Sequence, residues 1–266
     1  MIIDFHTHIF PDKIAGKTIE SLERISGITA STNGTLEGLL ASMEDSGVDM
    51  SVIMPVATKP AQMESINTYA KETCEKYPGK LISFGGIHPD CEDYKKELNC
   101  IKELGLKGIK IHPDYQKVSI DDVRFMNIIE YADELGLIIL THAGVDIGLP
   151  EKVYCPPDKL RKVLDTLKPK KMIAAHFGGW KQWQEVYEYL AGENVYLDTA
   201  FTFDFIDREM FLKVLNKHDE NKILFATDSP WSHAKRDIEA VKNLPVKDEI
   251  KQKIFSENAK KLLELY

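Results

Sequence analysis

The chain alternates eight times between a short apolar run and a longer amphipathic stretch. The runs are rich in Val, Ile and Leu and are continuously apolar, which is typical of strands buried on both faces of a parallel sheet. They are Ile2–His8, Met50–Ala57, Leu81–His88, Gly108–His112, Leu137–His142, Met172–His176, Val195–Asp198 and Ile223–Asp228. Eight such strand–helix units predict an α/β protein folded as a single (β/α)₈ TIM barrel, because eight parallel strands close into this barrel.

Helix patterns occupy the stretches that follow the runs. They are Leu36–Ser46, Ala61–Tyr77, Tyr94–Leu104, Asp121–Leu135, Pro157–Leu167, Gln182–Leu190, Asp207–Lys217, Ala234–Leu244 and a C-terminal extra helix, Lys247–Leu265. Gly47, Gly105 and Gly136 stand where left-handed C-caps belong, and Pro157 stands at a helix start. The longest connection, about Ile9 to Thr35, is expected to fold over the barrel mouth. A doubly wound open sheet is disfavoured, because HTHIFP and not a glycine-rich phosphate loop follows the first strand.

Length and charge narrow the class of protein. A chain of 266 residues suits one barrel domain over residues 1–266. Lys and Arg number 34 against 42 Asp and Glu, and the net charge of −8 disfavours nucleic acid and anionic membranes as partners. No apolar run approaches a membrane span of roughly 18 residues, and the first residues lack the basic region of a signal peptide. The four cysteines form no CxxC pair, so we expect reduced thiols, a cytoplasmic location and a small-molecule partner. A homodimer stays open.

Histidines gather at the ends of the predicted strands, where the active site of a TIM barrel lies. Six of the eight histidines stand there, accompanied by Asp228: His6, His8, His88, His112, His142 and His176. Residues two apart on a strand face the same side, so His6 and His8 can both point into the mouth, as can Lys110 and His112. Crowded imidazoles are costly without a cation, and a divalent metal ion makes the cluster favourable. The alternative of scattered core histidines is disfavoured, because clusters of His and carboxylate are rarely inert.

The order of these residues resembles the amidohydrolase superfamily, whose pattern is HxH on strand one, Lys or Glu on strand four, His on strands five and six, and Asp on strand eight. This chain supplies His6, His8, Lys110, His142, His176 and Asp228 in that order. The phrases HAGVD, AHFGGW and FATDSPW look like the amidohydrolase-related (amidohydrolase 2) branch of TIM-barrel metal-dependent enzymes. That branch holds small hydrolases and aromatic-acid decarboxylases. The resemblance covers the whole chain.

The resemblance leaves the number of metal ions open. The segment GIKIHPDY, residues 108–115, is similar to strand four of the urease catalytic subunit and less closely to that of dihydroorotases. This similarity implies that Lys110 is carbamylated and bridges two ions, with His112 as a substrate-polarising donor. The decarboxylase branch implies one ion and an unmodified Lys110 that anchors a substrate anion, while His176 activates water. The ligands of that single ion would be His6, His8, His142 and Asp228.

The ion and the reaction follow from this ligand set. Zn²⁺ is the default for a His/Asp site, with other divalent ions open, and Lys110 and His176 would complete a second site. A bound water would have a pKa near about 7, and Asp228 would accept its proton and pass it to the leaving group. His176 or His112 would stabilise the oxyanion. We therefore predict hydrolysis of a small amide, lactone or ester. The alternative is decarboxylation of a small aromatic or unsaturated acid, disfavoured because no arginine clamp follows a strand end.

Four residues are predicted to touch the substrate: His112, Lys59, Tyr115 and Trp180. Lys59 follows the second strand and is the preferred partner of a single anionic group. Asp4 shares a face with His6 and His8 but lies deeper in the barrel, so we expect a hydrogen-bonded core residue and not a ligand. Two further classes are disfavoured: a barrel that binds metal without turnover, since the ligand set is complete, and a barrel deoxyribonuclease, which has Glu in place of Lys110.

Overall fold

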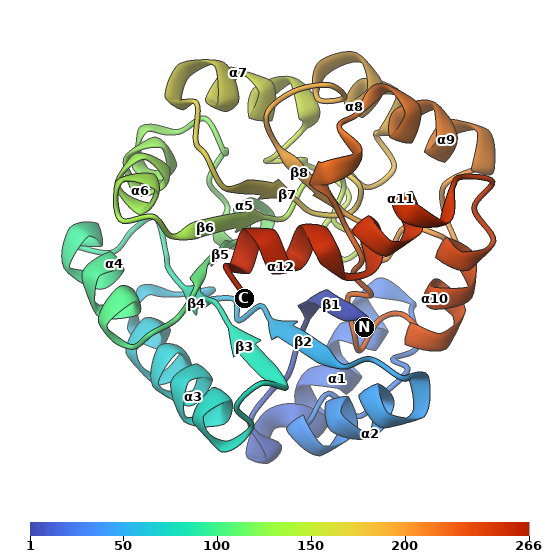
Figure 1. Ribbon diagram of the computed structural model, residues 1–266. Helices are drawn as coiled ribbons and strands as arrows, with labels where there is room; N and C mark the ends of the chain where they lie inside the picture. Colours follow the sequence, from blue (N-terminus) through green and yellow to red (C-terminus); the bar gives the residue numbers. More distant parts are fainter. Residues whose placement is uncertain (266) are drawn as a thin grey trace.

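The computed structural model describes residues 1–265, and its strands form a ring that the helices surround (Figure 1). The strands are β1 Ile3–Thr7, β2 Met50–Ile53, β3 Leu81–Ser83, β4 Gly85–Gly86, β5 Gly108–Ile111, β6 Ile138–Thr141, β7 Met172–Ala174, β8 Tyr196–Asp198 and β9 Ile223–Leu224. Only Phe84 separates β3 from β4, so the two segments share one of the eight strand positions. All paired neighbours run parallel. The eight predicted strands are confirmed.

The ring closes between the first strand and the last. The backbone N–H of Phe5 donates to the carbonyl of Phe225 at 2.9 Å, and that of Asp228 donates to the carbonyl of His6 at 2.8 Å. A parallel bridge between Thr7 and Ser229 extends this pairing. Closure removes the exposed sheet edge and brings the ends of the first and last strands side by side. The predicted (β/α)₈ barrel is confirmed.

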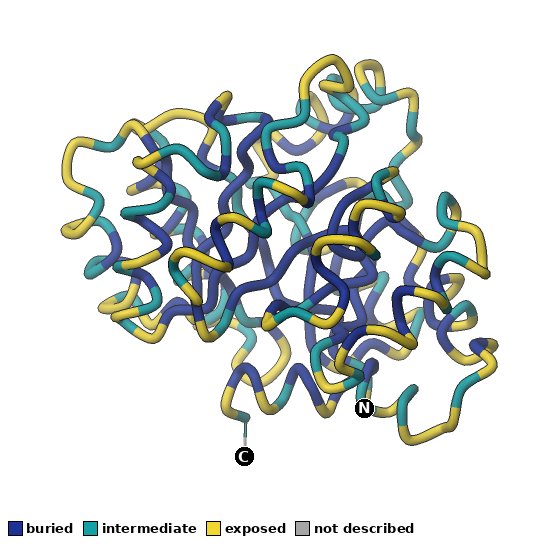
Figure 2. The backbone as a smooth tube through the Cα atoms, turned by 90° about the horizontal axis from the view of Figure 1, so that it is seen from above, coloured by how far each residue is buried: buried dark blue, intermediate teal, exposed yellow. Residues whose placement is uncertain are grey.

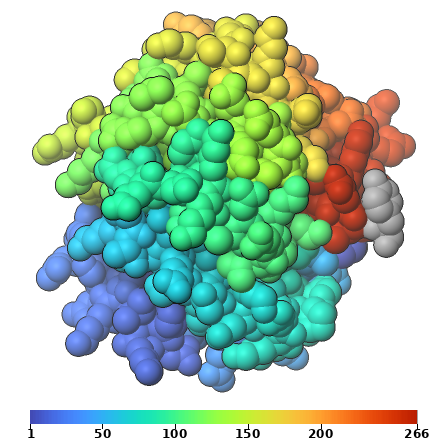
Figure 3. Space-filling view, turned by 90° about the vertical axis from the view of Figure 1, so that its left-hand side faces the viewer, coloured from blue at the N-terminus to red at the C-terminus, as the bar shows by residue number. Residues whose placement is uncertain are grey.

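The helices cover the outside of the barrel. They are α1 Asp12–Ser26, α2 Leu36–Ser46, α3 Met63–Lys76, α4 Tyr94–Glu103, α5 Pro113–Gln116, α6 Val123–Glu134, α7 Pro157–Leu167, α8 Trp183–Tyr189, α9 Arg208–Lys217, α10 Ala234–Lys242, α11 Asp248–Gln252 and α12 Asn258–Leu263. Figure 2 shows buried backbone in the centre and exposed backbone on the outer turns of the helices. In Figure 3, successive segments of the chain follow one another over the surface, from blue at the bottom through green to yellow at the top. Within residues 1–265, every helix is too short or too polar to cross a bilayer.

The predicted helix-end residues lie at helix ends in the structure. The sequence analysis did not predict two of the helices. Gly47, Gly105 and Gly136 each follow a helix with a φ of 75° or 76°, a conformation that glycine adopts without a steric penalty. The first new helix, α1, lies within the connection that was expected to be a loop. The second, α5, is a single turn that directly follows β5.

The C-terminal segment closes one end of the barrel. The α-helical segments α11 and α12 are joined by a π-helical segment, Lys253–Glu257, and α12 lies across the ring of strands in Figure 1. Leu262 and Leu263 pack with interior side chains of the strands, among them Ile3 and Leu140. The Asn258 amide fixes the helix by donating to the carbonyl of Ile223 at 2.8 Å. Apolar side chains therefore fill this end of the barrel, and the polar strand-end residues lie at the opposite end.

We predict that Leu262→Ala lowers the free energy of unfolding by about 2–5 kcal/mol, because it empties a volume that no neighbouring side chain can fill. Leu262 is 3% exposed. The neighbouring Lys261 is exposed, and Lys261→Ala should change stability by less than about 0.5 kcal/mol. Urea unfolding of both variants measures the difference. Equal effects would contradict a sealing role for α12.

A candidate metal centre at the mouth of the barrel

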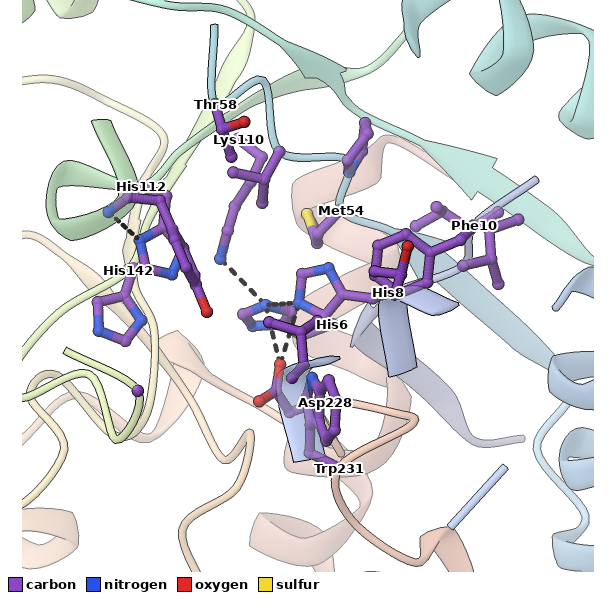
Figure 4. Close-up of a pocket in the computed structure, with 18 of the residues that line it drawn as sticks. His6, His8, Phe10, Met54, Thr58, Lys110, His112, His142, Asp228 and Trp231 are labelled. Carbon is purple, nitrogen blue, oxygen red and sulfur yellow. Dashed lines mark hydrogen bonds and ion pairs between the residues drawn. The ribbon is translucent and has the colours of Figure 1, made fainter. Parts of the chain in front are cut away.

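Three predicted ligands converge where β1 and β9 end. His6 Nε2 lies 3.2 Å from His8 Nε2 and 3.4 Å from Asp228 Oδ1, and His8 Nε2 lies 3.1 Å from the same oxygen. His6 and His8 share one face of the first strand, and ring closure brings Asp228 beside them (Figure 4). Two imidazole nitrogens and a carboxylate oxygen form a donor set that suits a divalent transition metal ion.

A buried carboxylate fixes the orientation of His6. His6 Nδ1 donates to Asp198 Oδ2 at 2.9 Å, and both side chains are fully buried. Because Nδ1 carries the proton, the lone pair of Nε2 points into the cluster. The other Asp198 oxygen accepts from the backbone N–H groups of His176 and Ala200 at 2.9 and 3.1 Å. The sequence analysis missed Asp198, although a carboxylate at the end of a predicted buried strand is itself a signal.

Burial keeps the imidazoles of the site neutral. Loss of hydration lowers the pKa of His6, His112 and His142 well below the usual 6.5, and neighbouring cationic groups lower it further. For His6 and His112 the largest of these charges is that of Lys110. The pKa of His176 falls to about 4, again chiefly because of burial. A neutral imidazole has a free lone pair at neutral pH, so these rings can accept a metal ion without first losing a proton.

Lys110 extends from β5 to the same cluster and is 1% exposed. Its Nζ lies 3.0 Å from His6 Nε2 and donates to that lone pair. Burial lowers the pKa of Lys110 to about 8, and the carboxylates of Asp228 and Asp198 oppose this shift. A divalent ion bound to His6 Nε2 would compete with the ammonium for the same lone pair. Binding therefore requires Lys110 to move aside, to pair with an anion or to lose its charge.

His142 lies apart from the cluster of His6, His8 and Asp228. His176 Nδ1 donates to the carbonyl of Ala200 at 3.1 Å, so its Nε2 is an acceptor, and His142 Nδ1 donates to it at 3.0 Å. His142 Nε2 is thereby left as a buried acceptor without a hydrogen-bond partner. The structure thus connects His142 to His176 directly.

A second set of metal-capable atoms surrounds His142. One ligand atom from each of His112, His142 and Asp146 lies within 4.8 Å of the others. The rings of His112 and His142 stack with centroids 4.2 Å apart, and His112 Nε2 lies 3.5 Å from Asp146 Oδ2. Asp146 stands in the loop between β6 and α7. This loop therefore places the Asp146 carboxylate at the mouth of the barrel.

Both sets line one cavity of about 520 Å³. Three of the predicted substrate contacts, His112, Tyr115 and Trp180, also line it. Lys59 does not: its side chain is exposed, while its neighbour Thr58 lines the cavity. The prediction for Lys59 was made from its place after the second strand. That place directly precedes the turn Pro60–Gln62, whose first two residues are exposed.

Two other positions clarify the site. Asp4 accepts hydrogen bonds from the Thr227 hydroxyl and backbone N–H at 2.6 and 3.0 Å, as expected of a core residue. His176 and Asp228 both adopt a positive φ, 59° and 68° respectively. Side chains other than glycine rarely take this conformation, and backbone strain of this kind concentrates at functional sites. Both residues were predicted to be catalytic.

A model of the amidohydrolase family matches residues 3–265. The chain belongs to the amidohydrolase family. This confirms the branch that the sequence motifs indicated and makes the protein a member of a family of metal-dependent enzymes. No curated protein matches the chain in sequence.

Solved structures share the fold of this chain at low identity. A TIM-barrel protein from Bordetella bronchiseptica is 20% identical, covers 99% of this chain and 98% of its own, and has a TM-score of 0.80. The 5-carboxyvanillate decarboxylase of Novosphingobium aromaticivorans, with bound manganese, is 16% identical, with 100% and 97% of the chains covered and a TM-score of 0.73. A dihydroxybenzoic acid decarboxylase from Polaromonas, with manganese and 2-nitroresorcinol, is 14% identical, with 99% and 97% covered and a TM-score of 0.72.

We predict that Asp198→Asn weakens metal binding about 10- to 100-fold, because an amide has one acceptor oxygen where the carboxylate serves His6 on one side and two N–H groups on the other. Titration of the metal-free protein with Mn²⁺ or Zn²⁺ measures the affinity. Asp237→Asn is the matched control, since Asp237 is also buried and accepts from Ser232 at 2.6 Å but does not line the cavity. Equal affinities in both variants would contradict the orienting role of Asp198.

Proposed function

We propose that this protein is a metal-dependent decarboxylase of a small aromatic or unsaturated acid. The observation that carries the proposal is the position of Lys110. Among the described residues that line the cavity, it is the sole lysine, and none is an arginine. Its ammonium adjoins the cluster of His6, His8 and Asp228. A substrate carboxylate placed between the ion and Lys110 would neutralise both and relieve their repulsion.

The comparisons favour this reaction over the hydrolysis that we preferred from the sequence. Two of the solved relatives are decarboxylases of substituted benzoic acids, and both hold manganese. Their metal supports a divalent ion at the mouth of this barrel. We propose Mn²⁺ or Zn²⁺, since imidazole and carboxylate ligands accept either.

We propose that His6, His8 and Asp228 hold the ion. His142, the fourth ligand expected from the sequence, is instead hydrogen-bonded to His176 and grouped with His112 and Asp146. When bound, the ion supplies Lewis-acid stabilisation of negative charge on the substrate and lowers the pKa of a coordinated water.

In the proposed reaction, Lys110 holds the substrate carboxylate while the bond between it and the neighbouring carbon breaks. The electron pair stays on that carbon, where an adjacent unsaturated system delocalises it, and CO₂ leaves. The proton that replaces CO₂ on that carbon comes from water: the Asp228 carboxylate accepts it and passes it to the carbon, which leaves hydroxide. The apolar cavity walls assist, because they favour neutral CO₂ over a buried carboxylate.

Hydrolysis remains the second candidate because His176 and Asp228 both lie beside His6. His176 lies with its ring centroid 5.5 Å from that of His6, and Asp228 Oδ1 lies 3.4 Å from His6 Nε2. In a hydrolase, Asp228 would accept a proton from water and pass it to the leaving group, and His176 would polarise the carbonyl. A carbamylated Lys110 belongs to this candidate, since it would bridge two ions.

For the metal, we predict about one equivalent of Mn²⁺ or Zn²⁺ in protein purified without chelator. Chelation should lower the melting temperature, and metal should restore it, because an ion that binds only the folded state stabilises it. His8→Ala should lose most of the ion. His233→Ala is the control, since His233 is exposed and lies outside the cavity lining. Two equivalents would favour the two-ion alternative, and none would contradict the proposed centre.

For the reaction, we predict release of CO₂ from hydroxybenzoates or related unsaturated acids, without ¹⁸O from labelled water in the organic product. Small amides, lactones and esters are assayed in parallel. Asp228→Asn should lower kcat about a hundredfold or more, through loss of the proton carrier. Its metal content is measured alongside, to separate this loss from loss of the ion. Incorporation of ¹⁸O into an acid product, with no CO₂ released, would establish hydrolysis instead.

A further inference from the structure

The cavity extends from the metal centre into a long apolar arm between α1 and α3. On α1, the residues that line it are Ile14, Thr18, Leu22, Ile25 and Ser26. On α3 they are Ser65, Ile66, Tyr69, Ala70 and Thr73. Each set recurs at three- and four-residue spacing, so each forms a stripe along one face of its helix. The two stripes line the same cavity from neighbouring strand–helix units.

The arm carries no ionic group, in contrast to the metal centre. Every Asp, His and Lys among the described lining residues belongs to the strand-end clusters or to the loop that carries Asp146. The stripes on α1 and α3 hold only apolar, hydroxyl and aromatic side chains. Met54, which is fully buried, and Phe10 lie beside His8 where the two parts of the cavity meet (Figure 4). The cavity thus has one charged end and one apolar end.

Two apolar side chains of the α1 stripe are left open to solvent. Ile14 is 51% exposed and Ile25 is 54% exposed, although both line the cavity. The adjacent face of the same helix is anchored by Ala15 and Ile19, which are buried. An apolar ligand that covers exposed apolar surface inside a cavity is bound favourably, because this surface is removed from water. From Ile14 to Ile25 the helix rises about 16 Å, which is longer than one aromatic ring.

We propose that the substrate is an acid joined to an extended apolar chain, whose polar group lies at the metal centre and whose chain lies in the arm between α1 and α3. The polar end of this inference rests on the proposed function, whereas the apolar end rests on the two stripes alone. The arm is a specificity element: it selects for the length of the chain and takes no part in bond breaking.

Binding of straight-chain carboxylates tests the arm without requiring turnover. Isothermal titration of Mn²⁺-loaded protein with acids from butanoate to decanoate should give affinities that rise with chain length, by up to about fourfold per methylene. Primary amides of the same lengths are titrated in parallel. The increase in affinity with chain length measures the contribution of the arm. The difference in affinity between an acid and the amide of the same length measures the contribution of the charged end. Loss of that difference alone would contradict the carboxylate site while leaving the arm intact.

Variants localise the effect. Leu22→Gln and Ile66→Gln should each weaken decanoate binding about tenfold and change butanoate binding less than about twofold, because only the longer chain reaches these positions. Lys17→Gln lies on the solvent side of α1, outside the cavity lining, and should leave both affinities unchanged. Circular dichroism and the melting temperature establish that each variant is folded. Affinity that is independent of chain length in the wild type, or equal decanoate affinity in all four proteins, would overturn the proposal.

Discussion

The site depends on the hydrogen bond between His6 and Asp198. Without a fixed acceptor for Nδ1, His6 could place its proton on either ring nitrogen, and one of the two neutral tautomers would turn an N–H toward the cluster. The buried Asp198 oxygen at 2.9 Å removes that freedom. It also ties the ends of β7 and β8 together through the backbone N–H groups of His176 and Ala200. One carboxylate thus orients a ligand and holds the strand ends that carry the other groups.

The barrel could be predicted from sequence because its strands are buried on both faces. Continuous apolar runs such as Ile138–Thr141 have no solvent-facing positions, so their pattern marks each strand clearly. The positions of His6, His8 and Asp228 followed from the same rule, since each stands where a run ends. Their convergence needs ring closure, which no local pattern encodes but which the number of strands implies.

The elements that were missed lie where the alternation gives no information. The helix α1 precedes α2, which was already the expected helix between the first two strands, and its apolar stripe faces a cavity instead of the core. Asp198 was overlooked because it is the last residue of a run that was interpreted as an apolar strand. Lys59 was chosen for its charge and its place after a strand, but the backbone turns into Pro60–Gln62 there and exposes the side chain. Chain position fixes which end of the barrel a residue occupies, and the local turn decides which way its side chain points.

The two ends of the barrel divide stability from chemistry. At one end α12 adds Leu262 and Leu263 to the interior packing of the strands. At the other end, four imidazoles, an ammonium and several carboxylates are buried together at a cost that packing must offset. The arrangement suits the binding of a cation together with an anion. An ion satisfies the lone pairs of His6 and His8, and an acid satisfies the ammonium of Lys110 that the ion displaces. Each partner thereby removes the electrostatic penalty that the other creates, so metal and acidic substrate should bind with positive coupling.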